Sequence, residues 1–153
     1  MSNKAIVAGV GMIPFTKPGA SESYEVMGSR AARQALDDAG LDYEKVQQAY
    51  VGYVYGDSTC GQAALYGVGL SGIPIFNVNN NCSTGSSALY LARQAVESGM
   101  TDCALALGFE QMNPGALGSV FDDRTNPLAR FNDEMSSLQG YDKEAPFAAQ
   151  FFG

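Results

Sequence analysis

The chain has 153 residues, a formal net charge of −7 at pH 7, a hydrophobic fraction of 46% and a charged fraction of 16%. This length fits one domain of typical size, and the composition is that of a folding chain, which excludes global disorder. The excess of Asp and Glu over Lys and Arg excludes a nucleic-acid-binding surface, and the lack of histidine excludes histidine-based catalytic and metal sites.

The first seventy residues alternate between strand and helix patterns. An apolar run rich in β-branched residues predicts a buried strand at 5–10. Apolar residues at helical spacing follow, between the capping candidate Ser23 and Gly40, a residue type that favours the end of a helix. A second strand is predicted at 49–55, and a short helix rich in Ala and Leu is predicted at 62–70.

The same alternation continues in the next segment of the chain. A third strand is predicted at 73–79, where Pro74 fits only the beginning of the strand or an edge position. A helix begins near Cys82 and stops at Gly99, and a fourth strand is predicted at 103–107. Strands that alternate with helices predict βαβ units, and therefore an α/β fold with a largely parallel, buried sheet.

The composition and periodicity of the sequence change after this alternation of strands and helices. Residues 112–146 carry turn-forming residues at a high density and only weak periodicity, and a structureless loop of that length is unusual inside one compact domain. We therefore divide the chain into an α/β domain at 1–111 and a loop or cover region at 112–153. Residues 145–152 predict an apolar helix that is cut off early, which indicates a truncated cover region and an incomplete chain.

The most informative segment for chemistry is the strand-to-helix turn that holds Cys82. A thiol at the start of a helix lies at the positive end of the helix dipole, a position that favours the nucleophilic thiolate. Small residues at 83–87 leave room for a substrate carbonyl, and backbone N–H groups there could hold an oxyanion. The alternative is that Cys82 is simply a small residue in a tight turn, and the residues alone leave both interpretations open.

The remaining candidates for a site are weaker. Cys103 lies within an apolar strand, where packing is expected. Cys60 lies in the loop at the start of a helix, where a capping role is expected. Residues 9–11 lack the third glycine of a dinucleotide-binding turn, and residues 122–124 are typical of a solvated loop rather than a metal site. Three cysteines without a CxxC pair also argue against a structural zinc site and a disulfide framework.

Residues 78–86, with the sequence Val-Asn-Asn-Asn-Cys-Ser-Thr-Gly-Ser, resemble the nucleophile segment of thiolases of the sterol carrier protein x (sterol carrier protein 2) type. The resemblance extends through segments 52–62, 72–74 and 105–110, and it covers nearly the whole chain. It implies a thiolase-like fold of two similar α/β halves, each a mostly parallel sheet with helices on both faces. This chain supplies most of the N-terminal half and the start of the loop excursion that helps to cover the site.

The resemblance implies that Cys82 is the catalytic nucleophile. In thiolases the matching cysteine attacks the carbonyl of a 3-ketoacyl-CoA, acetyl-CoA or propionyl-CoA leaves, and CoA then takes the acyl group from the enzyme thioester. The backbone N–H of Cys82 is expected to help to stabilise the tetrahedral intermediate. Acyl-CoA and CoA are then substrates, no permanently bound cofactor is implied, and a homodimer or tetramer is expected for the full-length protein.

The chain also departs from the pattern of these enzymes. Family members use histidines and a second cysteine C-terminal to position 153, whereas this chain has no histidine, and Cys103 falls in a strand. We therefore expect the N-terminal portion of an acyl-CoA thiolase of lipid or sterol side-chain degradation, inactive by itself. The main alternative is a non-catalytic dimerisation or acyl-binding module, and a ketoacyl synthase or a related aldolase fits less well.

The location of the protein is predicted from the absence of sorting signals. No apolar run approaches the roughly 18 residues of a membrane-spanning helix, so no integral membrane segment is expected. The start of the sequence lacks the basic region and cleavage site of a secretory signal. We expect a cytoplasmic protein, with the peroxisome as the alternative if the source is eukaryotic.

Overall fold

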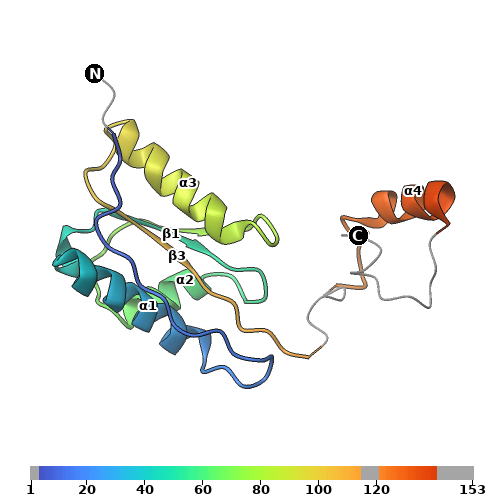
Figure 1. The fold of residues 1–153 in the computed structure, drawn as a ribbon, viewed down its shortest axis with the longest axis horizontal. Helices are drawn as coiled ribbons and strands as arrows, with labels where there is room; N and C mark the ends of the chain where they lie inside the picture. The colour runs from blue at the N-terminus through green and yellow to red at the C-terminus, as the bar shows by residue number, and fades with distance from the viewer. Residues whose placement is uncertain (1–3, 115–120, 141–153) are drawn as a thin grey trace. The chain divides into compact units, whose positions relative to one another are not determined.

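The computed structural model describes residues 4–114 and 121–140 (Figure 1). The chain divides into two compact units, Met1–Ala116 and Leu117–Gly153, and each is described by itself. The assignment of 1–111 to a partial thiolase domain and of 112–153 to a cover region stays a prediction. In the part of the chain that the structure describes, no helix combines the length and apolar character needed to span a membrane.

The first unit is built on a parallel, three-stranded sheet. Strand β1 (Gln48–Gly52) lies between β2 (Ile75–Val78) and β3 (Ala104–Gly108). The last residue of β1, Gly52, pairs with the last residue of each neighbour, so the carboxyl ends of all three strands meet at one edge. In open α/β sheets, this is the edge at which ligands bind.

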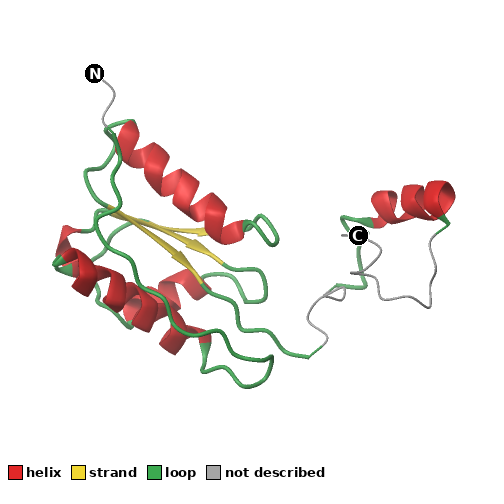
Figure 2. Ribbon diagram, viewed as in Figure 1, coloured by secondary structure: helices red, strands yellow, loops and turns green. Residues whose placement is uncertain are grey.

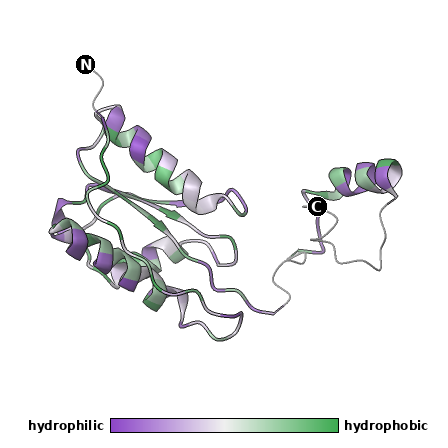
Figure 3. Ribbon diagram, in the orientation of Figure 1, coloured by the Kyte–Doolittle hydropathy of each residue, from purple (hydrophilic) through white to green (hydrophobic). Residues whose placement is uncertain are grey.

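Helices cover both faces of the sheet (Figure 2). Helices α1 (Tyr24–Ala39) and α2 (Cys60–Tyr66) pack on one face, and α3 (Thr84–Glu97) packs on the other. Figure 3 shows that α1 and α3 carry both hydrophilic and hydrophobic residues, as expected for helices with one face on a sheet. The prediction of an α/β fold with a mostly parallel sheet and helices on both faces is confirmed.

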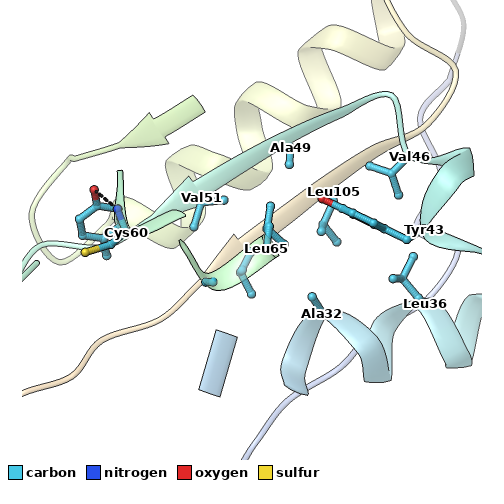
Figure 4. Close-up of a cluster of buried hydrophobic side chains, with 12 residues drawn as sticks. Ala32, Leu36, Tyr43, Val46, Ala49, Val51, Cys60, Leu65 and Leu105 are labelled. Atoms are coloured by element: carbon cyan, nitrogen blue, oxygen red, sulfur yellow. Dashed lines mark hydrogen bonds between the residues drawn. The ribbon is translucent and has the colours of Figure 1, made fainter. Parts of the chain in front are cut away.

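Alternating residues of the central strand divide the core into two layers. Ala49 and Val51 of β1 lie with Leu105 of β3 in the layer between the sheet and helices α1 and α2 (Figure 4). Tyr50, between them in the sequence, belongs to the opposite layer under α3. The residues that α3 buries in this layer are small, which lets the helix approach the sheet closely: Ala88, Ala92 and Ala95.

The prediction of a buried strand at 5–10 is wrong. This segment runs along α1 without strand pairing (Figure 1). The backbone N–H of Val10 donates to Asp38 Oδ2 at 2.8 Å, and that of Met12 donates to Gln34 Oε1 at 3.1 Å. Both acceptors belong to α1, so this segment is bound to side chains of a helix rather than to the backbone of a neighbouring strand.

The boundaries of α1 and the start of β2 agree with the sequence-based predictions, although the Ser23 side chain makes no capping hydrogen bond. Helix α1 begins after Ser23 and ends at Gly40, whose φ of +62° is the left-handed conformation that glycine adopts without strain. Pro74 directly precedes β2, an edge strand of the described sheet. Its carbonyl accepts a hydrogen bond from the N–H of Ala49 at 3.0 Å, so Pro74 still contributes an acceptor to the pairing with β1.

The described part of the second unit contains helix α4 (Ala129–Gln139), in the segment predicted as a loop or cover region without an assigned helix. None of its residues is buried, which explains why an apolar stripe was hard to recognise. Asp123 and Arg124 form an exposed ion pair, so the prediction of a solvated loop at 122–124 is confirmed. The helix predicted at 145–152 lies outside the described residues.

Candidate functional site

Cys82 lies in the turn between β2 and α3, which follows the carboxyl edge of the sheet. Its side chain is exposed, and its Sγ lies 3.9 Å from Oδ1 of Asn81. The next residue, Ser83, is the N-cap of α3, and the helix continues for 14 residues. The thiol is therefore accessible to a substrate and lies at the positive end of a long helix.

Side chains within the turn determine its conformation. The hydroxyl of Thr84 accepts a hydrogen bond from the N–H of Asn80 at 2.9 Å and donates one to the carbonyl of Asn81. The hydroxyl of Ser83 donates to the carbonyl of Asn80 at 2.9 Å. Asn81 has a φ of +48°, and its N–H donates to Oδ1 of Asn79 at 3.1 Å. Asparagine tolerates this left-handed conformation better than most residues, so the turn suits its composition.

The first turn of α3 lies close to the ends of two strands, and at Gly52 the approach leaves no room for a side chain. A Cβ atom added to Gly52 would lie 2.7 Å from Cγ2 of Thr84 and 2.8 Å from its carbonyl oxygen. A Cβ atom added to Gly108 would lie 3.5 Å from the Cα of Gly85. The close approach at Gly52 therefore places the Cys82 turn against the end of the central strand.

The two other cysteines do not join Cys82. Cys60 is buried, and its N–H donates to the hydroxyl of Tyr53 at 3.2 Å, which in turn donates to the carbonyl of Asp57 at 2.8 Å. Cys103 is half-buried, and burial raises the pKa of its thiol. Cys103 packs against the core, as predicted, whereas Cys60 is a member of the core and the first residue of α2 rather than the capping residue that the sequence predicted. Cys82 is the exposed cysteine of the chain.

An aromatic stack lies beside Cys60. Tyr24 stacks on Phe109 with ring centroids 5.4 Å apart, and Phe109 stacks on Tyr53 with centroids 5.2 Å apart. A hydrogen bond with the Cys60 side chain, together with burial, raises the pKa of Tyr24 to about 12, and burial raises the pKa of Tyr53. Both phenols therefore stay protonated at neutral pH and serve as packing and hydrogen-bonding groups rather than as bases.

Glu110 lies at the carboxyl edge of the sheet, and sequence reasoning did not identify its role there. Its carboxylate accepts hydrogen bonds from the N–H groups of Val54 at 3.0 Å and Tyr55 at 2.9 Å. It therefore connects the segment after β3 to the loop after β1. The available signal was a charged residue just beyond a buried strand, at the edge where ligands bind in such sheets.

Residues 5–135 match the family model described as Thiolase, N-terminal domain. The chain therefore belongs to the thiolase family. It is 53% identical over 154 residues to Sterol carrier protein 2 of Gallus gallus, covering 99% of this chain and 28% of that protein. It is 38% identical over 113 residues to Benzoylsuccinyl-CoA thiolase subunit BbsB of Thauera aromatica, covering 72% of this chain and 29% of that protein.

Solved structures show the same fold. The chain resembles 3-oxoacyl-[acyl-carrier-protein] synthase III from Aquifex aeolicus VF5 with a TM-score of 0.56 at 23% identity, covering 62% of this chain and 32% of that chain. The chain thus spans less than a third of the length of each of these three proteins. The resemblance to thiolases of the sterol carrier protein type and the thiolase-like fold are confirmed. The catalytic role of Cys82 stays a prediction.

Proposed function

We propose that this chain is the N-terminal portion of an acyl-CoA thiolase that cleaves 3-ketoacyl-CoA in lipid or sterol side-chain degradation. The observation that carries the proposal is the position of Cys82 in a chain of the thiolase family. It is an exposed thiol at the start of α3, beyond the carboxyl edge of the parallel sheet. In this proposal acyl-CoA and CoA are substrates, and the enzyme needs no permanently bound cofactor.

The proposed reaction has two steps. The Cys82 thiolate adds to the 3-keto carbonyl, the bond between C2 and C3 breaks, and C2 takes a proton as acetyl-CoA or propionyl-CoA leaves. The acyl group stays on sulfur as a thioester. The CoA thiolate then attacks this thioester, so the shortened acyl-CoA leaves and the Cys82 thiolate is restored. The Cys82 N–H stabilises the negative oxygen of each tetrahedral intermediate.

The proton donors and acceptors of both steps belong to residues outside this chain in our proposal. The chain contains no histidine. The carboxylate of Glu110 already accepts two backbone hydrogen bonds. Because the chain spans 28% of Sterol carrier protein 2 of Gallus gallus, the other acid–base groups and most of the CoA surface are assigned to the remainder of a longer protein.

Alkylation of the three cysteines tests the proposed nucleophile. The rate at each cysteine is measured by peptide mass spectrometry in the folded chain and in the urea-unfolded chain over a range of pH. We expect Cys82 to react faster in the folded chain, because the first turn of α3 stabilises negative charge on its sulfur. Cys60 and Cys103 are internal controls and should react more slowly when folded, because they are buried or half-buried.

Equal alkylation rates for Cys82 in the folded and unfolded chain would contradict its proposed role as the nucleophile. The same outcome would favour the alternative proposal of a non-catalytic dimerisation or acyl-binding module. A Cys82→Ser variant identifies the reacting peptide, because it removes that thiol and leaves the two others in place.

A further inference from the structure

Two threonines are the buried polar residues of the described chain, and they lie at opposite edges of the sheet. Thr84 is 4% exposed and begins α3 beyond the carboxyl edge. Thr101 is 6% exposed and precedes β3, at the amino edge, where its hydroxyl donates to Oε1 of Gln47 at 2.5 Å. Thr84 alone of the two contacts the segment that holds Cys82.

The Thr84 side chain connects the Cys82 turn to the sheet with both of its branches. Its hydroxyl accepts from the N–H of Asn80 and donates to the carbonyl of Asn81, the two residues that precede Cys82. Its methyl group lies against Gly52, where a Cβ atom would come within 2.7 Å of Cγ2. One buried residue therefore binds the turn and contacts the end of the central strand.

A helix start is usually stabilised by the side chain of its N-cap residue, and this is not so in α3. Ser83 is the N-cap of α3, yet its side chain makes no capping hydrogen bond to the helix and donates to the carbonyl of Asn80 instead. Exposed polar groups also join the turn to the helix, because the Asn80 side-chain amide donates to Ser87 Oγ at 2.8 Å. Thr84, the first helical residue, is the buried residue that bonds to the turn through its side chain. Without the Thr84 hydroxyl, the N–H of Asn80 would lose its acceptor, and the turn would lose its link to a buried group.

We infer that Thr84 is a positioning residue for Cys82, because it holds the preceding turn in the one conformation that places the thiol at the start of α3. The inference rests on the proposed function of Cys82 as a nucleophile. Thr84 acts through the turn rather than on the substrate. Its hydroxyl sets the conformation of residues 80–81, and its methyl group sets their distance from β1.

Three variants test this role in the full 153-residue chain. Thr84→Val removes the hydroxyl and keeps the branched shape, and Thr84→Ser keeps the hydroxyl. Thr101→Val removes the other buried threonine hydroxyl, at the far edge of the sheet, and is the matched control for a general loss of stability. The readouts are hydrogen exchange of the Asn80 amide and the pH profile of Cys82 alkylation in the folded and unfolded chain.

In Thr84→Val we expect the Asn80 amide to exchange about tenfold faster, the effect of losing one net hydrogen bond. The ratio of folded to unfolded alkylation rates at Cys82 should fall toward one. Thr84→Ser should keep both values within about twofold of the wild type, because it retains the acceptor. Thr101→Val should leave both unchanged.

Wild-type values in Thr84→Val, or equal effects of Thr84→Val and Thr101→Val, would overturn the inference. If Thr84→Val does not fold, Thr84→Ser is compared with Thr101→Val instead. Loss of Asn80 amide protection in Thr84→Ser would also overturn the inference. A wild-type Cys82 that reacts equally in both states would contradict the proposed function alone. Asn80 exchange would then still decide whether Thr84 holds the turn.

Discussion

At the residue scale, Gly52 is the position where a single atom decides how α3 meets the sheet. A Cβ atom there would lie 2.8 Å from the carbonyl oxygen of Thr84, a backbone atom that cannot move without moving the helix. By contrast, a Cβ atom on Gly85 would meet nothing within 4 Å. The two glycines therefore serve different purposes although they lie at the same edge.

We predict opposite effects for alanine at these two positions. Gly52→Ala should lower the free energy of unfolding by about 1–3 kcal/mol, the usual cost of overpacking. Gly85→Ala should raise it by roughly 0.5–1 kcal/mol, because alanine favours a helix and the space is open. Urea unfolding followed by circular dichroism measures both, and a neutral Gly52→Ala would contradict the close approach.

Tyr24 makes stability depend on pH in the alkaline range. Its pKa is raised from 10.0 to about 12 in the folded chain, first by the hydrogen bond with Cys60 and then by burial. The folded state therefore holds this proton more tightly than the unfolded state, so the stabilisation is complete below pH 10 and is lost as pH rises toward 12.

We expect the free energy of unfolding to fall between pH 10 and 12 and to fall less steeply in Tyr24→Phe. The phenylalanine keeps the stack on Phe109 and removes the titrating hydroxyl. Urea titrations at several pH values give the two slopes, and identical slopes would show that Tyr24 is not the cause. Burial of Cys103 raises its thiol pKa and has the same sign, so it contributes to the slope of both proteins.

At the scale of elements, the N-terminal segment shows how a helix can replace a strand partner. Its apolar side chains remain exposed, with Ile6 at 87% and Phe15 at 95%. Its backbone is bound instead to α1 through the Asp38 and Gln34 side chains. The segment therefore depends on a few polar contacts rather than on burial, which is typical of regions with low local stability.

We predict that Asp38→Ala releases this segment without unfolding the unit. The Val10 amide should exchange faster and the segment should be cleaved faster by a protease, while the unfolding midpoint changes little. Asp37→Ala is the matched control, because it removes the neighbouring carboxylate on the same helix. Equal protection of Val10 in wild type and Asp38→Ala would contradict this account.

At the scale of the whole molecule, the chain holds a nucleophile candidate but lacks histidine. We expect the purified 153-residue protein to show only background in a CoA-dependent 3-ketoacyl-CoA cleavage assay. A full-length thiolase assayed in parallel is the control. Turnover that Cys82→Ser abolishes would contradict the prediction, because it would show that this chain supplies all the acid–base groups.

The sequence predicted the position of Cys82 between a strand and the start of a helix, because this is a local pattern, and its catalytic role stays a prediction. Thr84 and Glu110 were not recognised, because their partners are set by the turn geometry and by strands far apart in the sequence. Glu110 accepts hydrogen bonds from Val54 and Tyr55, which precede it in the sequence by 56 and 55 positions. Helix α4 was missed for a different reason, since a helix without a buried face leaves no apolar stripe to detect.

The sequence by itself determined the α/β class, the parallel sheet, the ends of α1 and the family, because these follow from local periodicity, capping residues and a specific motif. The tertiary structure alone decided where backbone groups find their partners. The apolar run at 5–10 satisfied every local condition for a strand, yet its neighbour is a helix. Hydrophobic patterning depends on adjacent residues, whereas each hydrogen-bond partner depends on where distant segments meet.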